Sequence, residues 1–134
     1  MTLPALVIGL GEVLWDLLPS GKVLGGAPAN FAYMAQVLGD RGIVASRVGR
    51  DELGREACGV MQQLGLSTSY VQRDDELQTG TASITIDPGG STNLPNRRAG
   101  RVGFARMDRS LRRIVRERRC NLFWFAGSAI TDFR

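Results

Sequence analysis

The stretch Gly25-Gly26-Ala27-Pro28-Ala29-Asn30, followed by the apolar-periodic run 31–38, organises the first part of this sequence. Two adjacent glycines allow positive φ angles and a close approach of the backbone to a bound molecule. Pro28 suits the first turn of a helix, where free N–H groups attract oxygen-rich ligands. Asn30 adds an amide that both donates to and accepts from a hydroxyl. The stretch predicts either a ligand-binding helix start or a glycine turn that only leads into a packed helix.

The composition is that of one globular domain, with 134 residues, 43% hydrophobic and 22% charged. No apolar run has the length of a membrane span, and the N-terminus lacks a basic leader with a small-residue cleavage site. Cys58 and Cys120 are widely separated and the sequence has no histidine, which argues against a metal site or a Cys/His nucleophile. We expect a cytoplasmic protein with no membrane partner.

Up to residue 72, short apolar runs alternate with helical patterns, which is typical of parallel βαβ units. Strands are expected at 6–8, 43–48 and 70–72. The first helix begins at Pro28, and its expected core-facing residues are Phe31, Met34, Ala35 and Leu38. The second helix is capped by Asp51 and stopped by Gly65, and its expected apolar stripe is Leu53, Ala57, Val60, Met61 and Leu64.

Three further strand-like runs, at 13–18, 22–24 and 79–86, have a different character. The last alternates strictly, with Ala82, Ile84 and Ile86 on one face, which predicts an antiparallel sheet with one wet face. The first carries Asp16 in its middle, and a buried acid needs a partner. Asp16 either bonds to nearby backbone N–H groups or faces a cleft and accepts hydrogen bonds from ligand hydroxyls.

Four motifs in this order resemble the PfkB (ribokinase-like) carbohydrate kinases, and above all their fructokinase branch. They are Gly11-Glu12 through Asp16, then 25–32 with Pro-Ala-Asn-Phe-Ala, then 48–54, then Leu64-Gly65-Leu66. The resemblance covers residues 5–90. It implies an α/β fold, a ribokinase-like parallel sheet with helices on both faces plus a small β lid, which is incomplete at the C-terminal side.

The resemblance also implies a function, the transfer of the ATP γ-phosphoryl group to a sugar hydroxyl with ATP and Mg as cofactors. Asp16, Gly25, Gly26 and Asn30 match the family's sugar-binding positions. The family's catalytic Gly-x-Gly-Asp segment is absent from the sequence, so no catalytic residue is assigned. The chain is then the sugar-binding side of a kinase whose family often dimerises through the lid. A catalytically inactive fragment, or a sugar-binding module without ATP turnover, is the alternative.

Charge divides the chain into residues 1–90, the kinase-like part, and residues 91–134, an arginine-rich tail. The first part has six basic and ten acidic side chains, whereas the tail has eleven arginines and three acids. A one-nucleotide shift of the reverse-translated tail permits the family's Ala-Ala-Trp-Asp and Cys-Phe-Gly-Ser-Leu segments in order. We therefore interpret the tail as out-of-frame translation. The competing interpretation, a basic helix that binds nucleic acid or an anionic membrane, is less favoured because no such binding module surrounds it.

Overall fold

The computed structural model describes residues 3–83, 85–90, 92–93, 97–98, 108–117 and 120–124. Its elements are β1 (Leu6–Leu10), β2 (Leu14–Leu18), β3 (Gly21–Gly25), α1 (Ala27–Val37), β4 (Arg41–Gly49), α2 (Glu52–Gln63), β5 (Val71–Asp74), β6 (Gly80–Ser83), β7 (Thr85–Ile86), β8 (Thr92–Asn93), β9 (Arg97–Arg98), α3 (Arg109–Glu117) and β10 (Cys120–Trp124).

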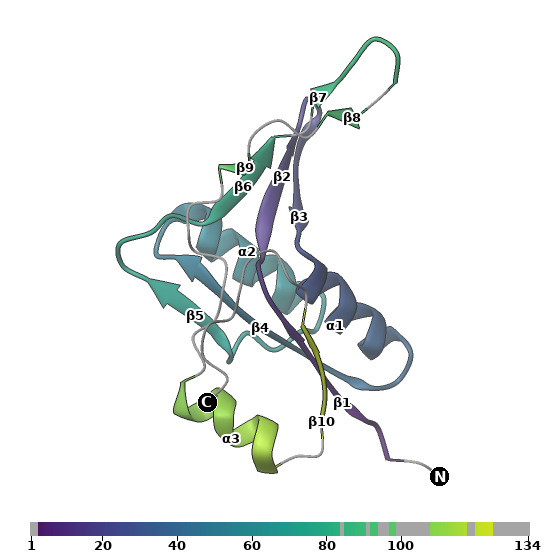
Figure 1. Cartoon of the computed structure of the whole chain (residues 1–134), viewed down its shortest axis with the longest axis vertical. Coiled ribbons are helices and arrows are strands. Elements are labelled where there is room, and N and C mark those ends of the chain that lie inside the picture. The colour runs from purple at the N-terminus through teal and green to yellow at the C-terminus, as the bar shows by residue number, and fades with distance from the viewer. Residues whose placement is uncertain are drawn as a thin grey trace.

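The main sheet has four parallel strands in the order β10-β1-β4-β5 (Figure 1). All five residues of β1 are buried, because this strand lies between two neighbours and is covered on both faces. The expected strands at 6–8, 43–48 and 70–72 correspond to β1, β4 and β5. The predicted parallel α/β architecture is confirmed.

Helices cover both faces of the main sheet, as expected. Val44 and Val48 of β4 pack with α1 and α2 in one core cluster. Ile43 and Ala45, which alternate with them, pack in a second cluster with Leu111 of α3. None of the helices in the described ranges combines the length and the apolar character that crossing a membrane requires.

The buried face of α1 differs from the expectation. Ala29, Ala32 and Ala35 are buried, whereas Met34 is 53% and Leu38 is 79% exposed. Small residues face the sheet because the helix backbone lies directly on two glycines of the strands. A Cβ atom on Gly42 of β4 would overlap the carbonyl oxygen of Ala32, and one on Gly9 of β1 would overlap that of Pro28.

The second helix begins and ends where predicted. Asp51 caps α2 by accepting a hydrogen bond from the backbone N–H of Gly54 at 2.8 Å, and Gly65 follows the helix with φ of +78°. Ala57 and Met61 are buried as expected, Leu53 and Val60 pack against the core, and Leu64 is exposed.

The Asp51 carboxylate also binds Thr79, at the start of the lid. Oδ2 accepts from the Thr79 backbone N–H at 2.8 Å and Oδ1 accepts from its hydroxyl at 2.6 Å. Burial by itself would raise the pKa of Asp51, but the hydrogen bonds from Thr79 and Gly54 together outweigh burial and hold this pKa below its ordinary value.

A second sheet, in the order β3-β2-β6-β9, forms the lid and rises from the end of β1 (Figure 1). β2, β3 and β6 correspond to the three further runs of the sequence, and the run 79–86 is divided between β6 and β7. The antiparallel sheet expected for 79–86 is correct only in part. β6 pairs antiparallel with β9 but in parallel with β2, and β7 pairs antiparallel with β8 in a separate two-stranded sheet. β2 and β6 each enter the lid from the main sheet rather than through a hairpin, so the two strands run in the same direction. Ala82 is buried as predicted, while Ile84 and the Ile86 side chain lie outside the described residues.

Part of the segment 91–134 belongs to the same α/β body. Asp108 caps α3 by accepting from the Leu111 N–H at 2.9 Å, and this bond, with those from Ser110 and Gln72, lowers the pKa of Asp108 despite its partial burial. The 3.1 Å bond from the Gln72 amide ties α3 to β5, and β10 pairs with β1. Out-of-frame translation stays a prediction, because it concerns the gene's nucleotide sequence.

Gly42→Ala is expected to lower the free energy of unfolding by ~2–3 kcal/mol, since neither the β4 nor the α1 backbone can yield to the new methyl group. The matched control is Gly59→Ala in the interior of α2, where a Cβ meets no atom within 4 Å. That control is expected to stabilise the protein by ~0.5–1 kcal/mol, because alanine favours the helix. Urea unfolding of both variants measures the difference. Equal effects of the two substitutions would contradict the close helix–sheet contact.

Asp51→Asn is expected to lower the free energy of unfolding by ~1–2 kcal/mol at neutral pH, because the amide replaces one of the two oxygens that accept from Thr79 and Gly54. Because the folded-state pKa lies below the ordinary 3.8, the carboxylate stabilises the fold above that pH and loses its effect as the pH falls through the folded-state pKa. The gap between parent and variant should therefore shrink below pH 4. Urea unfolding from pH 3 to 7 measures it, with Asp75→Asn in an exposed ion pair as control. A gap independent of pH would refute the assignment.

Candidate functional site

Three chain crossings meet where the lid joins the carboxyl end of the main sheet. The chain passes from β1 into β2 at 11–13, from β3 into α1 at 25–26, and from β5 into β6 at 79–80. Parallel α/β sheets bind their ligands at this end of the strands. The four residues predicted to bind sugar belong to this region, on β2, at the β3–α1 crossing and in the first turn of α1.

Asp16 and Gly25 contact each other. They lie on the paired strands β2 and β3, where Leu14 is opposite Gly25 and Asp16 is opposite Val23. The Asp16 carboxylate is half-buried, and its Oδ2 atom occupies the space that a Cβ on Gly25 would take. The carboxylate can lie there only because Gly25 has no side chain.

Gly26 is required by both its conformation and its surroundings. It is the residue before α1, its φ is +109°, and a Cβ there would overlap the carbonyl oxygen of Glu12. A side chain would be strained on the first count and would clash on the second. The two glycines of the predicted pair thus have different roles. Gly25 leaves space for the Asp16 side chain, and Gly26 leaves space for the Glu12 backbone.

Asn30 lies one helical turn beyond Gly26, and its backbone N–H donates to the Gly26 carbonyl at 3.3 Å. Its side chain is exposed. Asp16, Gly25 and Gly26 are thus joined by direct contact or by sequence, and Asn30 is joined to Gly26 through the helix backbone. Pro28 occupies the first turn of α1, as expected.

Glu12 also belongs to this region and was given no role by the sequence. Its Oε1 atom is buried and would lie 2.9 Å from a Cβ built on Gly80, the first residue of β6. Glu12 and Gly80 are 68 positions apart in the chain, so their contact could not be predicted from local spacing. The signal in the sequence was the Gly11-Glu12 motif, which contains this acid. It adds a second carboxylate to the lid region, at the start of β6.

Trp15 holds β2 against the main body. The side chain is 4% exposed, its indole N–H donates to the Leu53 carbonyl at 3.0 Å, and the Lys22 ammonium lies 5.0 Å from the ring centre. Asp16 is the next residue along β2. The Trp15 contacts therefore restrict the strand that carries the Asp16 carboxylate.

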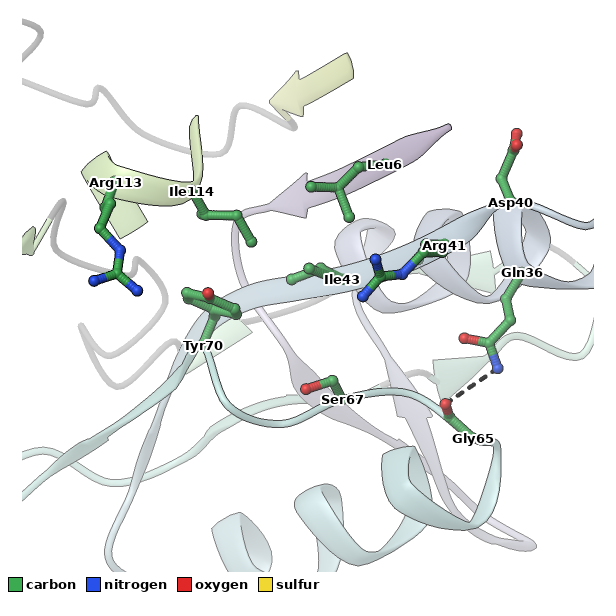
Figure 2. A pocket seen from close by; sticks show the side chains of 11 residues that line it. Leu6, Gln36, Asp40, Arg41, Ile43, Gly65, Ser67, Tyr70, Arg113 and Ile114 are labelled. Atoms are coloured by element: carbon green, nitrogen blue, oxygen red, sulfur yellow. Dashed lines mark hydrogen bonds between the residues drawn. The ribbon is translucent and has the colours of Figure 1, made fainter. Parts of the chain in front are cut away.

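A cavity of about 500 Å³ lies at the opposite end of the main sheet (Figure 2). Arg41 and Leu6, the first residues of β4 and β1, border it, and the Gln36 amide beside it donates to the Gly65 carbonyl at 3.1 Å (Figure 2). Its lining residues are Leu6, Gln36, Asp40, Arg41, Gly42, Ile43, Gly65, Ser67, Tyr70, Arg113 and Ile114. None of the residues predicted to bind sugar lines this cavity, which is therefore distinct from the lid region.

Comparison with known proteins identifies the family to which this chain is similar. The profile of the family described as "pfkB family carbohydrate kinase" matches residues 20–102. A curated protein named probable fructokinase-4, from Arabidopsis thaliana, is 33% identical over 94 residues, which are 61% of this chain and 29% of that protein. The chain spans less than a third of the length of the curated relatives it matches.

Solved structures of fructokinases are also similar to this chain. Apo fructokinase from Vibrio cholerae O395 matches with a TM-score of 0.61 and 26% identity, over 69% of this chain and 33% of the other. Fructokinase with bound ATP from Xylella fastidiosa matches with a TM-score of 0.58 and 26% identity, over 70% of this chain and 31% of the other. The fold, the order of the motifs and the profile match together show that this chain belongs to the pfkB family of carbohydrate kinases.

Proposed function

We propose that this chain forms the sugar-binding side of a fructokinase-type kinase, which transfers the ATP γ-phosphoryl group to a sugar hydroxyl. The observation that carries the proposal is the Asp16 carboxylate seated on Gly25, at the carboxyl end of a parallel sheet. A carboxylate accepts hydrogen bonds from two neighbouring hydroxyls of a polyol, and the Asn30 amide both donates and accepts. Gly26 lets the backbone approach the same ligand.

Binding through hydroxyl groups favours a sugar over an apolar molecule of similar size. A site whose polar groups pair with substrate hydroxyls rejects analogues that lack them, because a carboxylate covered by the bound molecule would be left without partners. The relatives in the comparisons carry the name fructokinase, so fructose is the sugar we propose. Half-buried Asp16 and Glu12 at the base of the lid are the acidic groups available for such recognition.

The phosphoryl-transfer groups belong, in this proposal, to the part of the family fold that the chain does not span. The sequence contains no Gly-x-Gly-Asp segment, the family's source of the catalytic aspartate. Among the residues that the structure describes, no three His, Cys, Asp or Glu side chains gather in a way that suits a metal ion. We therefore assign ATP and Mg to that other part of the family fold.

Assembly and location follow the family in the same proposal. Among the strands that the structure describes, β3 ends the lid sheet on one side, and Val23 on it is 53% exposed. This side of the sheet offers an apolar side chain and a strand edge to a second lid. We propose a dimer through this edge, in the cytoplasm. The alternative, a sugar-binding module without ATP turnover, shares the Asp16 site and differs only in the absence of ATP consumption.

We also propose that residues 91–134 are translated out of frame. The curated matches extend over about 60% of the chain, and ten of the tail's arginines fall between Arg97 and Arg119. The coding nucleotide sequence is the test. In the shifted frame we expect an open stretch that reads Cys-Phe-Gly-Ser-Leu near the codons of 120–127. Stop codons in that frame, or the absence of that strand, would refute the proposal.

Asp16→Ala is expected to weaken fructose binding at least tenfold, about 1.4 kcal/mol, because the sugar hydroxyls lose their charged acceptor. Titration calorimetry of the whole chain with fructose measures the effect. Asp75→Asn is the matched control, since Asp75 is exposed and pairs with Arg50 rather than with a residue of the proposed sugar site. We expect the control to bind like the parent, and neither protein to consume ATP with fructose. Unchanged binding by Asp16→Ala, or no saturable binding by the parent, would overturn the proposed function.

A further inference from the structure

The lid is attached to the main sheet through side chains at the carboxyl end of β4. Ser46 is fully buried, and its hydroxyl oxygen accepts from the Val13 N–H at 3.1 Å, where the chain passes from β1 into β2. Asp51, two residues beyond β4, binds Thr79, where the chain passes from β5 into β6. Both crossings that lead into the lid are thus held by polar side chains, Ser46 on β4 and Asp51 in the turn after it.

The Thr79 attachment is saturated and tightly enclosed. Besides its two bonds to Asp51, the Thr79 hydroxyl oxygen accepts from the Gly49 N–H at 3.0 Å, and the residue is 4% exposed. A Cβ on Gly49 would lie 2.8 Å from both the Thr79 nitrogen and Asp51 Oδ2, and one on Gly54 would lie 2.9 Å from the Thr79 hydroxyl. Two glycines therefore leave space for this side chain and for nothing larger. We call Asp51, Thr79 and the Gly49 N–H the lid clamp.

The lid clamp acts on the sugar-binding strand through two steps. Thr79 is followed directly by Gly80, which pairs with Leu14 and lies against Glu12. β6 then continues along β2, so that Ala82 is opposite Asp16. A shift of Thr79 would move β6 and, through the backbone pairing, the strand that carries the Asp16 carboxylate. No residue of the clamp itself needs to touch the sugar.

We propose that Asp51 and Thr79 are positioning residues that hold the Asp16 carboxylate in its sugar-binding geometry before the sugar arrives. This inference rests on the proposed function of the lid region. Pre-organisation of this kind raises affinity because the ordering of the site precedes binding. Neither residue is a catalytic residue, since both act through β6 and β2.

Trp15 provides a local spectroscopic readout of the clamp. It precedes Asp16 on β2, is opposite Thr81 of β6, and its indole is buried with a hydrogen bond to Leu53. The chain has two tryptophans, so a Trp124→Phe background leaves Trp15 as the only one. Displacement of β6 should change the environment of the indole and shift its emission to longer wavelength.

The experiment compares Thr79→Val with Thr79→Ser in that background. Valine matches the shape of threonine, but its side chain cannot donate to Asp51 Oδ1 or accept from the Gly49 N–H, whereas serine keeps both bonds. The bond from the backbone N–H of residue 79 to Asp51 Oδ2 remains in both variants. We expect Thr79→Val to bind fructose at least tenfold more weakly with a red-shifted Trp15 emission. Thr79→Ser, and the control Ser83→Ala at an exposed position of β6, should stay within twofold of the background with unchanged emission. Circular dichroism restricts the comparison to temperatures at which each protein is folded.

Asp51→Asn carries the same test if Thr79→Val does not fold, because the amide turns a donor toward one of the Thr79 donors. We expect weaker fructose binding and a red shift from it as well. Parent-like affinity and emission in folded Thr79→Val or Asp51→Asn would overturn the clamp. Failure of the background protein to bind fructose would refute the proposed function instead, and the Trp15 emission of the valine and serine variants would still decide whether the clamp holds β2.

Discussion

The structure depends on the direct contact of the α1 backbone with two strands of the main sheet. Gly9 and Gly42 have no side chains, so the carbonyl groups of Pro28 and Ala32 lie where Cβ atoms would otherwise stand. Close packing of backbone on backbone leaves room only for alanine on this side of the helix, and it fixes the height of the first turn of α1 over the sheet. Gly26 and Asn30 take their places from that turn.

The lid region combines two kinds of restraint. The first restraint is close packing at three glycines. The Asp16 carboxylate lies against Gly25, the Glu12 carbonyl against Gly26 and the Glu12 carboxylate against Gly80, each where a side chain would otherwise stand. The second restraint is hydrogen bonding. Ser46 of β4 and Asp51, just beyond β4, accept from backbone N–H groups at the chain crossings. Buried backbone groups at crossings between sheets need such partners, because no ladder of hydrogen bonds continues there. The same bonds that satisfy the backbone thus hold the starts of β2 and β6 against the main sheet.

The two ends of the main sheet have different chemistry. The carboxyl end carries the lid, two acids and the glycine pair, whereas the amino end carries the cavity bordered by Arg41, Arg113 and Tyr70 (Figure 2). Leu111 of α3 is 1% exposed and completes the core on the second face of the sheet. Acidic Asp108 and Gln72 tie this helix to β5. Residues from the arginine-rich segment therefore pack against the main sheet through α3 and β10, and they also add the strand β9 to the lid.

Local patterns were sufficient to predict the parallel sheet and both caps of α2, whereas the sugar-binding role of Asp16, the glycine pair and Asn30 came from the family resemblance and stays a prediction. The sheet and the caps depend on spacing within a few residues, and such spacing is readable in a single chain. Apolar spacing misassigned Met34 and Leu38 of α1, because it does not register how closely Gly42 brings the helix to the sheet. The parallel pairing of β6 with β2, the approach of Glu12 to Gly80, and the bond from Asp51 to Thr79 join positions 28 to 68 residues apart. Such contacts follow from how the strands are connected in space, so they were decided by the folded chain and not by any stretch of its sequence.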